Sequence, residues 1–264
     1  MMLKKIFKNF SLGGERTGQP LVVLGSSSSE VFDYIFGDAP NYFPYWASGW
    51  SARSLGKDKH KQYLTKILEP IPREANVILN FGTVDVNFIC RHMAASKGIY
   101  DFKRIIDEAA EGILEAESLI RSQGFMSVYA SFISPSISLP QPYWDRFNQS
   151  RQLPDRMLGN MYYDLFKKTS QMMPAIDAFE ELSQTHNGSY LLAREFMRDD
   201  QDHHADYIKT QKIAWSKLRC LIPWFDGAIY SLEWKEALWD KFVMGAPRPR
   251  TPSERQYSDR KLRT

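Results

Sequence analysis

The sequence predicts an α/β fold, a three-layer α/β/α sandwich built around a mostly parallel sheet. Short apolar runs with no internal alternation, such as Leu21-Val22-Val23-Leu24, are typical of strands that are buried on both faces. Longer segments with apolar residues at helical spacing alternate with these runs, and Gly, Pro or Ser marks the junctions. Strands that alternate with helices along a chain form parallel sheets with helices on both faces.

The first half of the chain supplies three of the expected strands. In order, we expect a strand at 21–24, a helix that begins with the capping-box pattern Ser27-Ser28-Ser29-Glu30 and stops at Gly37, a strand at 42–46 interrupted by Pro44, a helix at 57–69 and a strand at 75–81. The last of these strands lies between a proline-containing turn and Gly82. Together they make two successive strand–helix–strand units.

The second half begins with the clearest helix of the chain, at 101–123, where apolar residues follow one face and Gly124 marks the stop. We then expect a strand at 126–132, a surface loop rich in Pro, Ser and aromatic residues at 134–153, a helix at 154–168, a weaker helix at 175–183, and helices at 205–218 and 232–244. No internal repeat is visible. The order of elements therefore indicates one core domain.

Charge divides the chain into three parts. The whole sequence of 264 residues has a net charge of +3, but residues 1–16 carry +3 and residues 245–264 carry +4, which leaves −4 for the body between them. We expect a lead-in at 1–19, a core domain with a C-terminal helical extension at 20–244, and a basic flexible tail at 245–264. The basic ends could touch nucleic acid or anionic lipid, although a solvated tail accounts for them as well.

Composition excludes several classes of protein. With 43% hydrophobic and 25% charged residues, the chain is neither mainly disordered nor collagen-like, and its apolar runs fall well short of the roughly 20 residues that span a bilayer. The N-terminus reaches Lys8 and Asn9 before an apolar signal-peptide region develops. Cys90 and Cys220 form no Cys-x-x-Cys pair and indicate free thiols in a reducing compartment. These features predict a cytoplasmic protein without a transmembrane segment.

In a parallel sheet, ligands bind beyond the carboxyl ends of the strands. That rule selects residues 25–29, 47–50 and 82–87, which follow the first three strands. A serine between the first strand and a helix N-terminus is exposed at the sheet edge, where the helix dipole favours negative charge. The alternative is that Ser27 and Glu30 only cap the helix, and the two roles are compatible.

A second polar segment, residues 198–206, precedes the helix at 205–218. Its Asp200 lies three residues before His203, and an aspartate at that distance can orient an imidazole that serves as the base for a serine. The segment also fits a solvated acidic helix N-terminus. A metal site is a third reading, which the adjacency of His203 and His204 disfavours because two ligands on one helix face need i, i+4 spacing.

Taken together, these segments resemble the SGNH/GDSL hydrolases over residues 21–218. The similarity consists of Gly25-Ser26-Ser27 after the first strand, Gly49 after the second, Gly82-Thr83-Val84-Asp85 after the third, and Asp200-x-x-His203 before the last core helix. The resemblance implies a flavodoxin-like sheet of the SGNH type. It also implies serine ester hydrolysis through an acyl-enzyme, with neither a cofactor nor a metal.

The resemblance assigns roles residue by residue. Ser27 matches the family's nucleophile, with Asp200 and His203 as the acid and base of the triad. The backbone N–H groups of Ser27 and Gly49 match donors of the oxyanion hole, the site that binds the negative oxygen of the reaction intermediate. His204 is the alternative base because it is the adjacent imidazole, but only His203 has the Asp-x-x-His spacing and is favoured. If His203 is the base, we expect His204 to contact the substrate.

Two positions depart from the family's pattern. Ser26 replaces the acidic residue that usually precedes the nucleophile, and Val84 stands where the family has an asparagine that donates to the oxyanion. Asn87 is the nearest amide that could replace it, although strand alternation would group Asn87 with Asp85 and leave Val84 on the opposite face.

Around this site we also expect substrate contacts. Trp50 is one of several aromatic residues in the loops that could pack on an acyl chain or a sugar face, and Asp85 lies in the third block. The expected substrate is a small-molecule or glycan ester, most plausibly a carbohydrate or small lipid-like acyl ester. A carbohydrate O-acyltransferase would use the same serine chemistry, and a weakened SGNH-fold binding module would explain Val84. Because zinc-finger spacing, RNA-binding aromatic motifs and a phosphate loop are all missing from the sequence, we expect no nucleic-acid partner, and the oligomeric state is left open.

Overall fold

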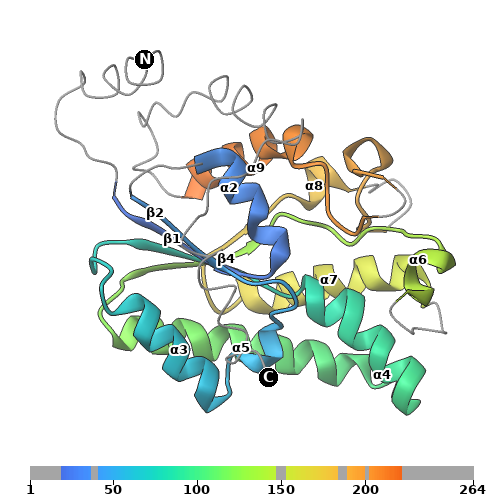
Figure 1. The fold of residues 1–264 in the computed structure, drawn as a ribbon, viewed down its shortest axis with the longest axis horizontal. Helices are drawn as coiled ribbons and strands as arrows, with labels where there is room; N and C mark the ends of the chain where they lie inside the picture. The colour runs from blue at the N-terminus through green and yellow to red at the C-terminus, as the bar shows by residue number, and fades with distance from the viewer. Residues whose placement is uncertain (1–18, 37–40, 147–152, 184–188, 200–201, 222–264) are drawn as a thin grey trace.

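A computed structural model of the chain describes residues 19–36, 41–146, 153–183, 189–199 and 202–221. These residues form a parallel five-stranded sheet in the order β2-β1-β3-β4-β5, with helices on both faces (Figure 1). The three-layer α/β/α fold and its parallel sheet are therefore confirmed. The strand order is the flavodoxin-like one, in which a site is expected where the chain turns from one side of β1 to the other.

The strands are β1 (Leu21–Gly25), β2 (Tyr42–Trp46), β3 (Asn76–Asn80), β4 (Ser127–Phe132) and β5 (Ala175–Asp177). The longer helices are α2 (Glu30–Phe36), α3 (Asp58–Leu68), α4 (Cys90–Lys97), α5 (Phe102–Ser122), α7 (Asp155–Ser170) and α9 (Tyr207–Leu221). The short helical turns are η2 (Ser27–Ser29), η3 (Ala52–Ser54), η4 (Asp85–Ile89), α6 (Gln141–Asp145), α8 (Phe179–Leu182) and η6 (Arg194–Phe196).

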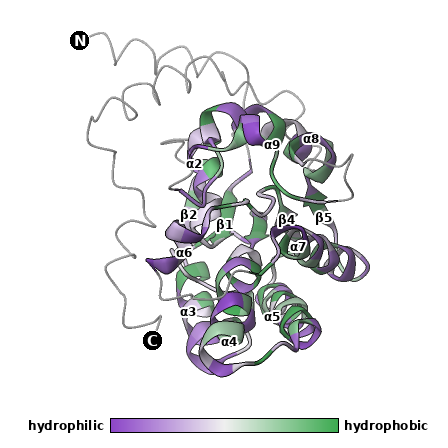
Figure 2. Cartoon of the chain, turned by 90° about the vertical axis from the view of Figure 1, so that its right-hand side faces the viewer, coloured by the Kyte–Doolittle hydropathy of each residue, from purple (hydrophilic) through white to green (hydrophobic). Residues whose placement is uncertain are grey.

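Strand β1 shows why the sheet is covered on both sides. Its side chains alternate, so that Leu21 and Val23 pack with α2 and α9 while Val22 and Leu24 pack with α3 and α5. All four are at most 2% exposed. Figure 2 shows the same layers from the side, with hydrophobic strands between helices whose outer surfaces are largely hydrophilic. Burial on both faces is the physical reason for the continuous apolar run in the sequence.

The two edge strands differ from simple expectation. Strand β2 pairs only with β1, and its Pro44 is tolerated because an edge strand does not need every backbone N–H for pairing. At the other edge, β5 corrects the helix expected at 175–183. Residues 175–177 pair with β4, and only Phe179–Leu182 are helical. Three residues are too few to show the two-residue period of a strand, so the sequence does not distinguish residues 175–177 from the start of a helix.

A helix that the sequence did not predict follows β3. Gly82 has a φ of +101°, and this left-handed turn leads directly into η4, a π-helical turn, which continues as α4. The π-helical turn is a rare feature that occurs frequently at functional sites. It changes which residues of the third block share a face, as described below.

The expected domain boundaries stay predictions. Residues 1–18 and 222–264, which include the lead-in, the helix expected at 232–244 and the basic tail, lie outside the described residues. The loop expected at 134–153 contains the short helix α6, and residues 147–152 within it also lie outside that part. Among the described helices, none combines the length and the apolar character that crossing a membrane requires.

Candidate active site

The turn after β1 brings one serine to the surface and buries its neighbours. A Cβ added to Gly25 would lie 2.4 Å from the backbone oxygen of Asn80, so only glycine lets β1 and β3 approach each other at this point. The chain then enters η2, where Ser26, Ser28 and Ser29 are buried and Ser27 is half-buried. The helix begins one residue earlier than the capping-box pattern suggested, with Ser26 as an N-cap that makes no side-chain capping bond.

Ser27 is joined to a histidine and an aspartate from the other end of the domain. Its Oγ lies 2.8 Å from Nε2 of His204, and Nδ1 of the same ring lies 2.7 Å from Oδ1 of Asp202. Only 16% of the His204 side chain is exposed. An imidazole with a hydroxyl on one nitrogen and a carboxylate on the other has the geometry of a Ser-His-Asp triad.

The segment that carries His204 is closed on itself. Met197 and Ala205 form an antiparallel bridge, and the backbone N–H of Asp206 donates to the carbonyl of Phe196 at 2.8 Å. These contacts join the two ends of the segment that carries His204 directly before α9. In addition, the hydroxyl of Tyr207, in the first turn of α9, lies 3.5 Å from the carbonyl oxygen of Ser27. This segment thus holds the histidine at the sheet edge opposite η2.

Electrostatics favour a charged Asp202 next to a histidine. Burial acts to raise the pKa of the Asp202 carboxyl, but the hydrogen bonds and charge of His204 and the charge of Arg198 outweigh it and hold the pKa well below its usual range. Nη1 of Arg198 lies 2.8 Å from the second carboxylate oxygen of Asp202. The carboxylate is therefore ionised at neutral pH and can stabilise an imidazolium at His204.

A network of hydroxyl groups supports the turn that carries Ser27. Oγ of Ser26 lies 3.0 Å from Oγ of Ser28 and 3.0 Å from Oγ1 of Thr83, which begins the helix after β3. The side-chain amide of Asn80 lies 3.2 Å from Oγ of Ser28 and 3.0 Å from Oγ of Ser29. These contacts tie the turn after β1 to the end of β3. They hold Ser27 without using its own hydroxyl.

A pocket of about 360 Å³, counting the part open to solvent, surrounds Ser27 and His204. It lies between η2, the start of the helix after β3, the loop after β4 and the segment before α9. Its walls are formed by Ser27, Ser28, Thr83, Val84, Asn87, Phe88, Ser134, Pro135, Ile137, His203, His204, Ala205 and Tyr207.

Asn87 lies in the wall of this pocket, on the same side as Val84. Because the chain after Gly82 is helical, residues four apart share a face, which groups Asn87 with Thr83 and Phe88 with Val84. The strand alternation that would have separated Asn87 from Val84 does not apply. Asn87 is 7% exposed, and its Oδ1 has no hydrogen-bond partner among the described residues. Asn87 therefore places a side-chain amide in the pocket wall that also contains Ser27.

His203 lies beside the triad rather than in it. Its Nδ1 lies 2.5 Å from the hydroxyl of Tyr143, and its ring centre is 3.9 Å from that of His204. The structure thus places His204 where the Asp-x-x-His spacing predicted His203. Asp200, the expected acid, lies outside the described residues. Asp202 occupies the position next to the imidazole, and its spacing to His204 is two residues instead of the three of the Asp-x-x-His pattern.

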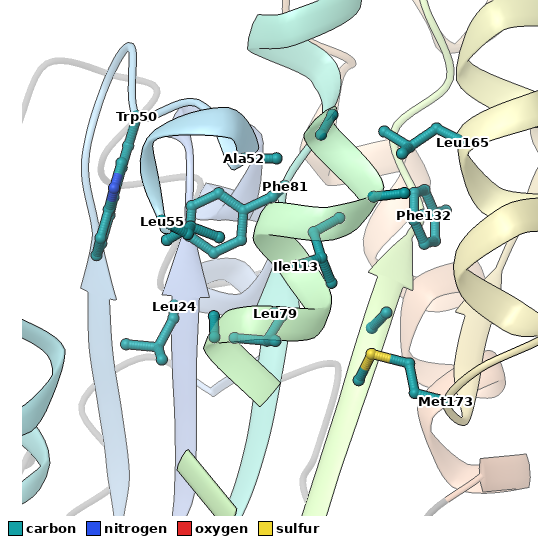
Figure 3. Packing of buried hydrophobic residues seen from close by; sticks show 14 of the residues in the cluster. Leu24, Trp50, Ala52, Leu55, Leu79, Phe81, Ile113, Phe132, Leu165 and Met173 are labelled. Atoms are coloured by element: carbon teal, nitrogen blue, oxygen red, sulfur yellow. The ribbon is translucent and has the colours of Figure 1, made fainter. Parts of the chain in front are cut away.

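Gly49, Trp50 and Asp85 were also expected at the site, but none of them is among the described residues that line the pocket. Gly49 is exposed. Trp50 packs in the interior against Phe81 (Figure 3), with ring centres 5.2 Å apart. Its Nε1 donates to Nδ1 of His60 at 3.0 Å. Asp85 is fully buried. Its carboxylate accepts the backbone N–H groups of Ala52 and Arg53, which begin η3, and Asp85 is not among the residues that line the pocket.

Asp202, His203 and His204 could also hold a metal ion, since one potential ligand atom from each lies within 4.8 Å of the others. However, both ring nitrogens of His204 already have partners at hydrogen-bond distance. Both carboxylate oxygens of Asp202 are engaged as well. Metal binding would have to break these contacts, so the donor set fits acid–base chemistry better than metal coordination.

No family model and no curated protein matches the sequence. Among solved structures, the chain is similar to a protein described as "a putative platelet activating factor from Streptococcus pneumonia". The two share 16% sequence identity with a TM-score of 0.48, over 82% of this chain and 91% of the other.

Proposed function

We propose that the protein is a serine ester hydrolase in which Ser27 is the nucleophile, His204 the general base and Asp202 the acid that orients it. The observation that carries the proposal is the continuous chain of short contacts from Ser27 Oγ through both nitrogens of His204 to Asp202. A half-buried serine that contacts an imidazole at the wall of a pocket is the arrangement that serine catalysis requires.

The reaction would proceed in two halves. In the first, Ser27 Oγ attacks the ester carbonyl while Nε2 of His204 takes the hydroxyl proton, and the imidazolium then returns this proton to the departing alcohol. In the second, His204 removes a proton from water, which attacks the acyl-serine, and the imidazolium returns this proton to Oγ of Ser27 as the bond between Oγ and the acyl group breaks and the carboxylic acid is released. The ionised carboxylate of Asp202 stabilises the imidazolium in both halves.

The negative oxygen of each intermediate needs hydrogen-bond donors. We assign this role to the backbone N–H of Ser27 and to the side-chain amide of Asn87, whose place in the pocket wall supports the assignment. The valine at position 84 can donate no hydrogen bond. Gly49 stays a prediction from the sequence as a further donor.

The pocket favours a short acyl group. Its volume is small, and its walls combine the apolar side chains of Val84, Phe88 and Ile137 with the polar groups of the triad. An acetyl or similarly short ester would bury its methyl group against the apolar side while its carbonyl faces Ser27. Water is the simplest acceptor in the second half of the reaction.

The decisive experiment is covalent labelling with a serine-directed fluorophosphonate, followed by mass spectrometry of the labelled peptide. We expect labelling at Ser27 in the wild-type protein and none in Ser27→Ala or His204→Ala. Ser122→Ala, which removes an exposed hydroxyl on α5, serves as the matched control and should be labelled normally. Hydrolysis of acetate esters should fall at least about a thousandfold in Ser27→Ala.

A folded wild-type protein that neither reacts with the probe nor releases acid from acetate esters would overturn the proposal. Release of acid only when a glycan acceptor is absent, with transfer to the glycan when it is present, would instead identify an acyltransferase.

A further inference from the structure

His203 lies in the pocket wall, and the triad does not use it. Three aromatic rings fix its position: His204 on one face, Phe88 edge-on at 5.0 Å between ring centres, and Tyr143 through its hydroxyl. The Tyr143 side chain, on α6, is itself 2% exposed. A histidine held this firmly at the wall of a pocket has a defined direction for each ring nitrogen.

The contacts also define the protonation of the His203 ring. Burial, with smaller contributions from His204 and Arg198, lowers the pKa of His203 to about 4, so its ring is neutral at neutral pH. A phenol is a stronger acid than a neutral imidazole, and burial raises the pKa of Tyr143 to about 12, so the phenol keeps its proton. With the stronger acid of the pair taken as the donor, the Tyr143 hydroxyl donates to Nδ1 across 2.5 Å, and this assignment leaves the ring proton on Nε2.

Nε2 of His203 has no hydrogen-bond partner among the described residues, although its residue lines the pocket. It is thus a fixed N–H donor without an acceptor. A polar group near a binding site that finds no partner within the protein commonly finds one on the ligand.

The side of the pocket on which this donor lies follows from the mechanism. His204 returns its proton to the departing alcohol, so the alcohol oxygen must come within hydrogen-bond reach of His204 Nε2. The ring of His203 is 3.9 Å from that of His204, between ring centres, and so flanks the alcohol portion of the ester. Asn87 is assigned to the opposite task, which is to bind the carbonyl oxygen.

We propose that His203 is a specificity-determining donor for the alcohol portion of the substrate: its Nε2–H binds a second oxygen next to the ester, so the preferred substrates are esters of polyols such as glycerol or sugars. Tyr143 acts as a positioning residue that keeps the ring proton on Nε2. The inference rests on the proposed function and adds the substrate class to it.

Two nearly isosteric esters test the proposal. In 2-methoxyethyl acetate an ether oxygen replaces one methylene of n-butyl acetate, so the former offers an acceptor and the latter does not. The ratio of their kcat/KM values, divided by the ratio of their alkaline hydrolysis rates, isolates what the protein recognises. We expect a preference for the ether of about three- to tenfold, the usual strength of one neutral hydrogen bond.

Variants assign this preference to His203. His203→Leu should remove it by lowering kcat/KM for 2-methoxyethyl acetate more than for n-butyl acetate, whereas His203→Gln, whose amide can place a donor near the Nε2 position, should retain part of it. Tyr143→Phe should weaken the preference. Nitrogen-15 NMR of the imidazoles should show His203 as the Nε2–H tautomer in wild type and a mixture of tautomers in Tyr143→Phe, a readout that does not depend on activity.

The outcomes separate this inference from the proposed function. If wild type hydrolyses both esters through Ser27 with no corrected preference, or if His203→Leu keeps the preference, the specificity role is overturned and the hydrolase stands. Loss of both activities in His203→Leu with normal labelling of Ser27 would also overturn it, because His203 would then serve the chemistry itself. If Ser27 is inert in wild type, both proposals fail.

Discussion

Asp202 and His204 are joined twice within three residues of chain. One carboxylate oxygen of Asp202 accepts the backbone N–H of His204 at 3.0 Å and faces the ring Nδ1 of the same residue at 2.7 Å. The backbone contact fixes the direction of the main chain, and the ring contact fixes the direction of the side chain. The proposed acid and base therefore lie close together in the sequence, and only Ser27 comes to them from a distant part of the chain.

The first prediction concerns this unit. Asp202→Asn should lower kcat for an acetate ester by about 10³- to 10⁴-fold with little change in KM, because an amide can hold His204 in the wrong tautomer and cannot stabilise an imidazolium. Steady-state kinetics measure the effect. Asp199→Asn, an exposed aspartate three residues earlier, is the matched control and should keep the wild-type rate. Equal rates in the two variants would argue against Asp202 as the acid.

The second prediction concerns the hydroxyl network that holds the Ser27 turn. Thr83→Val keeps the shape of the side chain but removes the oxygen that contacts both Ser26 and Ser28. We expect a loss of about 1 kcal/mol in the free energy of unfolding and a several-fold fall in kcat. Thr83→Ser keeps the hydroxyl and should behave like wild type in urea unfolding and in the ester assay. A valine variant with full activity would show that the network does not position Ser27.

The third prediction concerns Asn87, the side-chain donor that we propose for the oxyanion hole. Asn87→Ala should reduce kcat by about 10²-fold or more without a matching rise in KM, because the amide acts on the charge that develops in the intermediate. Adding Val84→Asn, one position after Thr83 on the same wall, should restore part of the rate. If Asn87→Ala is fully active, the donor must be sought elsewhere.

The fourth prediction concerns the pH dependence of stability. Burial raises the pKa of Asp85 to about 6, although the backbone N–H groups of Ala52 and Arg53 oppose the shift. An unfolded aspartate titrates near 4, so the folded protein binds the extra proton between these values and its stability falls as pH rises through that window. Asp85→Asn lacks this dependence.

The wild-type protein should therefore exceed Asp85→Asn in unfolding free energy by more at pH 4 than at pH 7, the difference being on the order of 2 kcal/mol. Urea unfolding at both pH values measures it. A gap that stays constant or widens toward pH 7 would contradict a raised pKa.

The fifth prediction is that metal chelation leaves the activity unchanged. The nitrogens of His204 are taken by Ser27 and Asp202, so the proposed reaction needs no metal ligand there. Treatment with EDTA followed by desalting should keep at least most of the wild-type kcat. Loss of activity that is restored by a divalent cation would point to the cluster of Asp202, His203 and His204 as a metal site.

The sequence predicted the layers well because both faces of the sheet are buried. Strand β1 is an unbroken apolar run, and α5 has a complete apolar face. In each case the sequence pattern indicates both the type of element and which of its residues are buried. Strand β5 and helix α4 carry no such signal. The former is three residues long, and the latter follows a π-helical turn whose onset depends on Gly82 adopting a positive φ.

For the candidate site, the sequence singles out Ser27 because a polar turn directly follows a buried strand, and the structure places this serine next to His204. Which of His203 and His204 faces Ser27 could not be decided from spacing, because it depends on the bridge between Met197 and Ala205 that closes the segment before α9. Adjacent residues in a tight loop point in different directions, and one peptide unit decides which ring faces the serine.

The proposed nucleophile and base each lie next to one of two helices on the same side of the sheet. Ser27 leads into α2 and His204 precedes α9, and these helices meet where Phe36 packs edge-on against Trp215 and Tyr34 against Tyr207. The distance between Ser27 and His204 thus depends on how α2 and α9 pack. Substitutions in this buried contact between the two helices can change that distance, and with it the proposed activity, while every residue that lines the pocket stays the same.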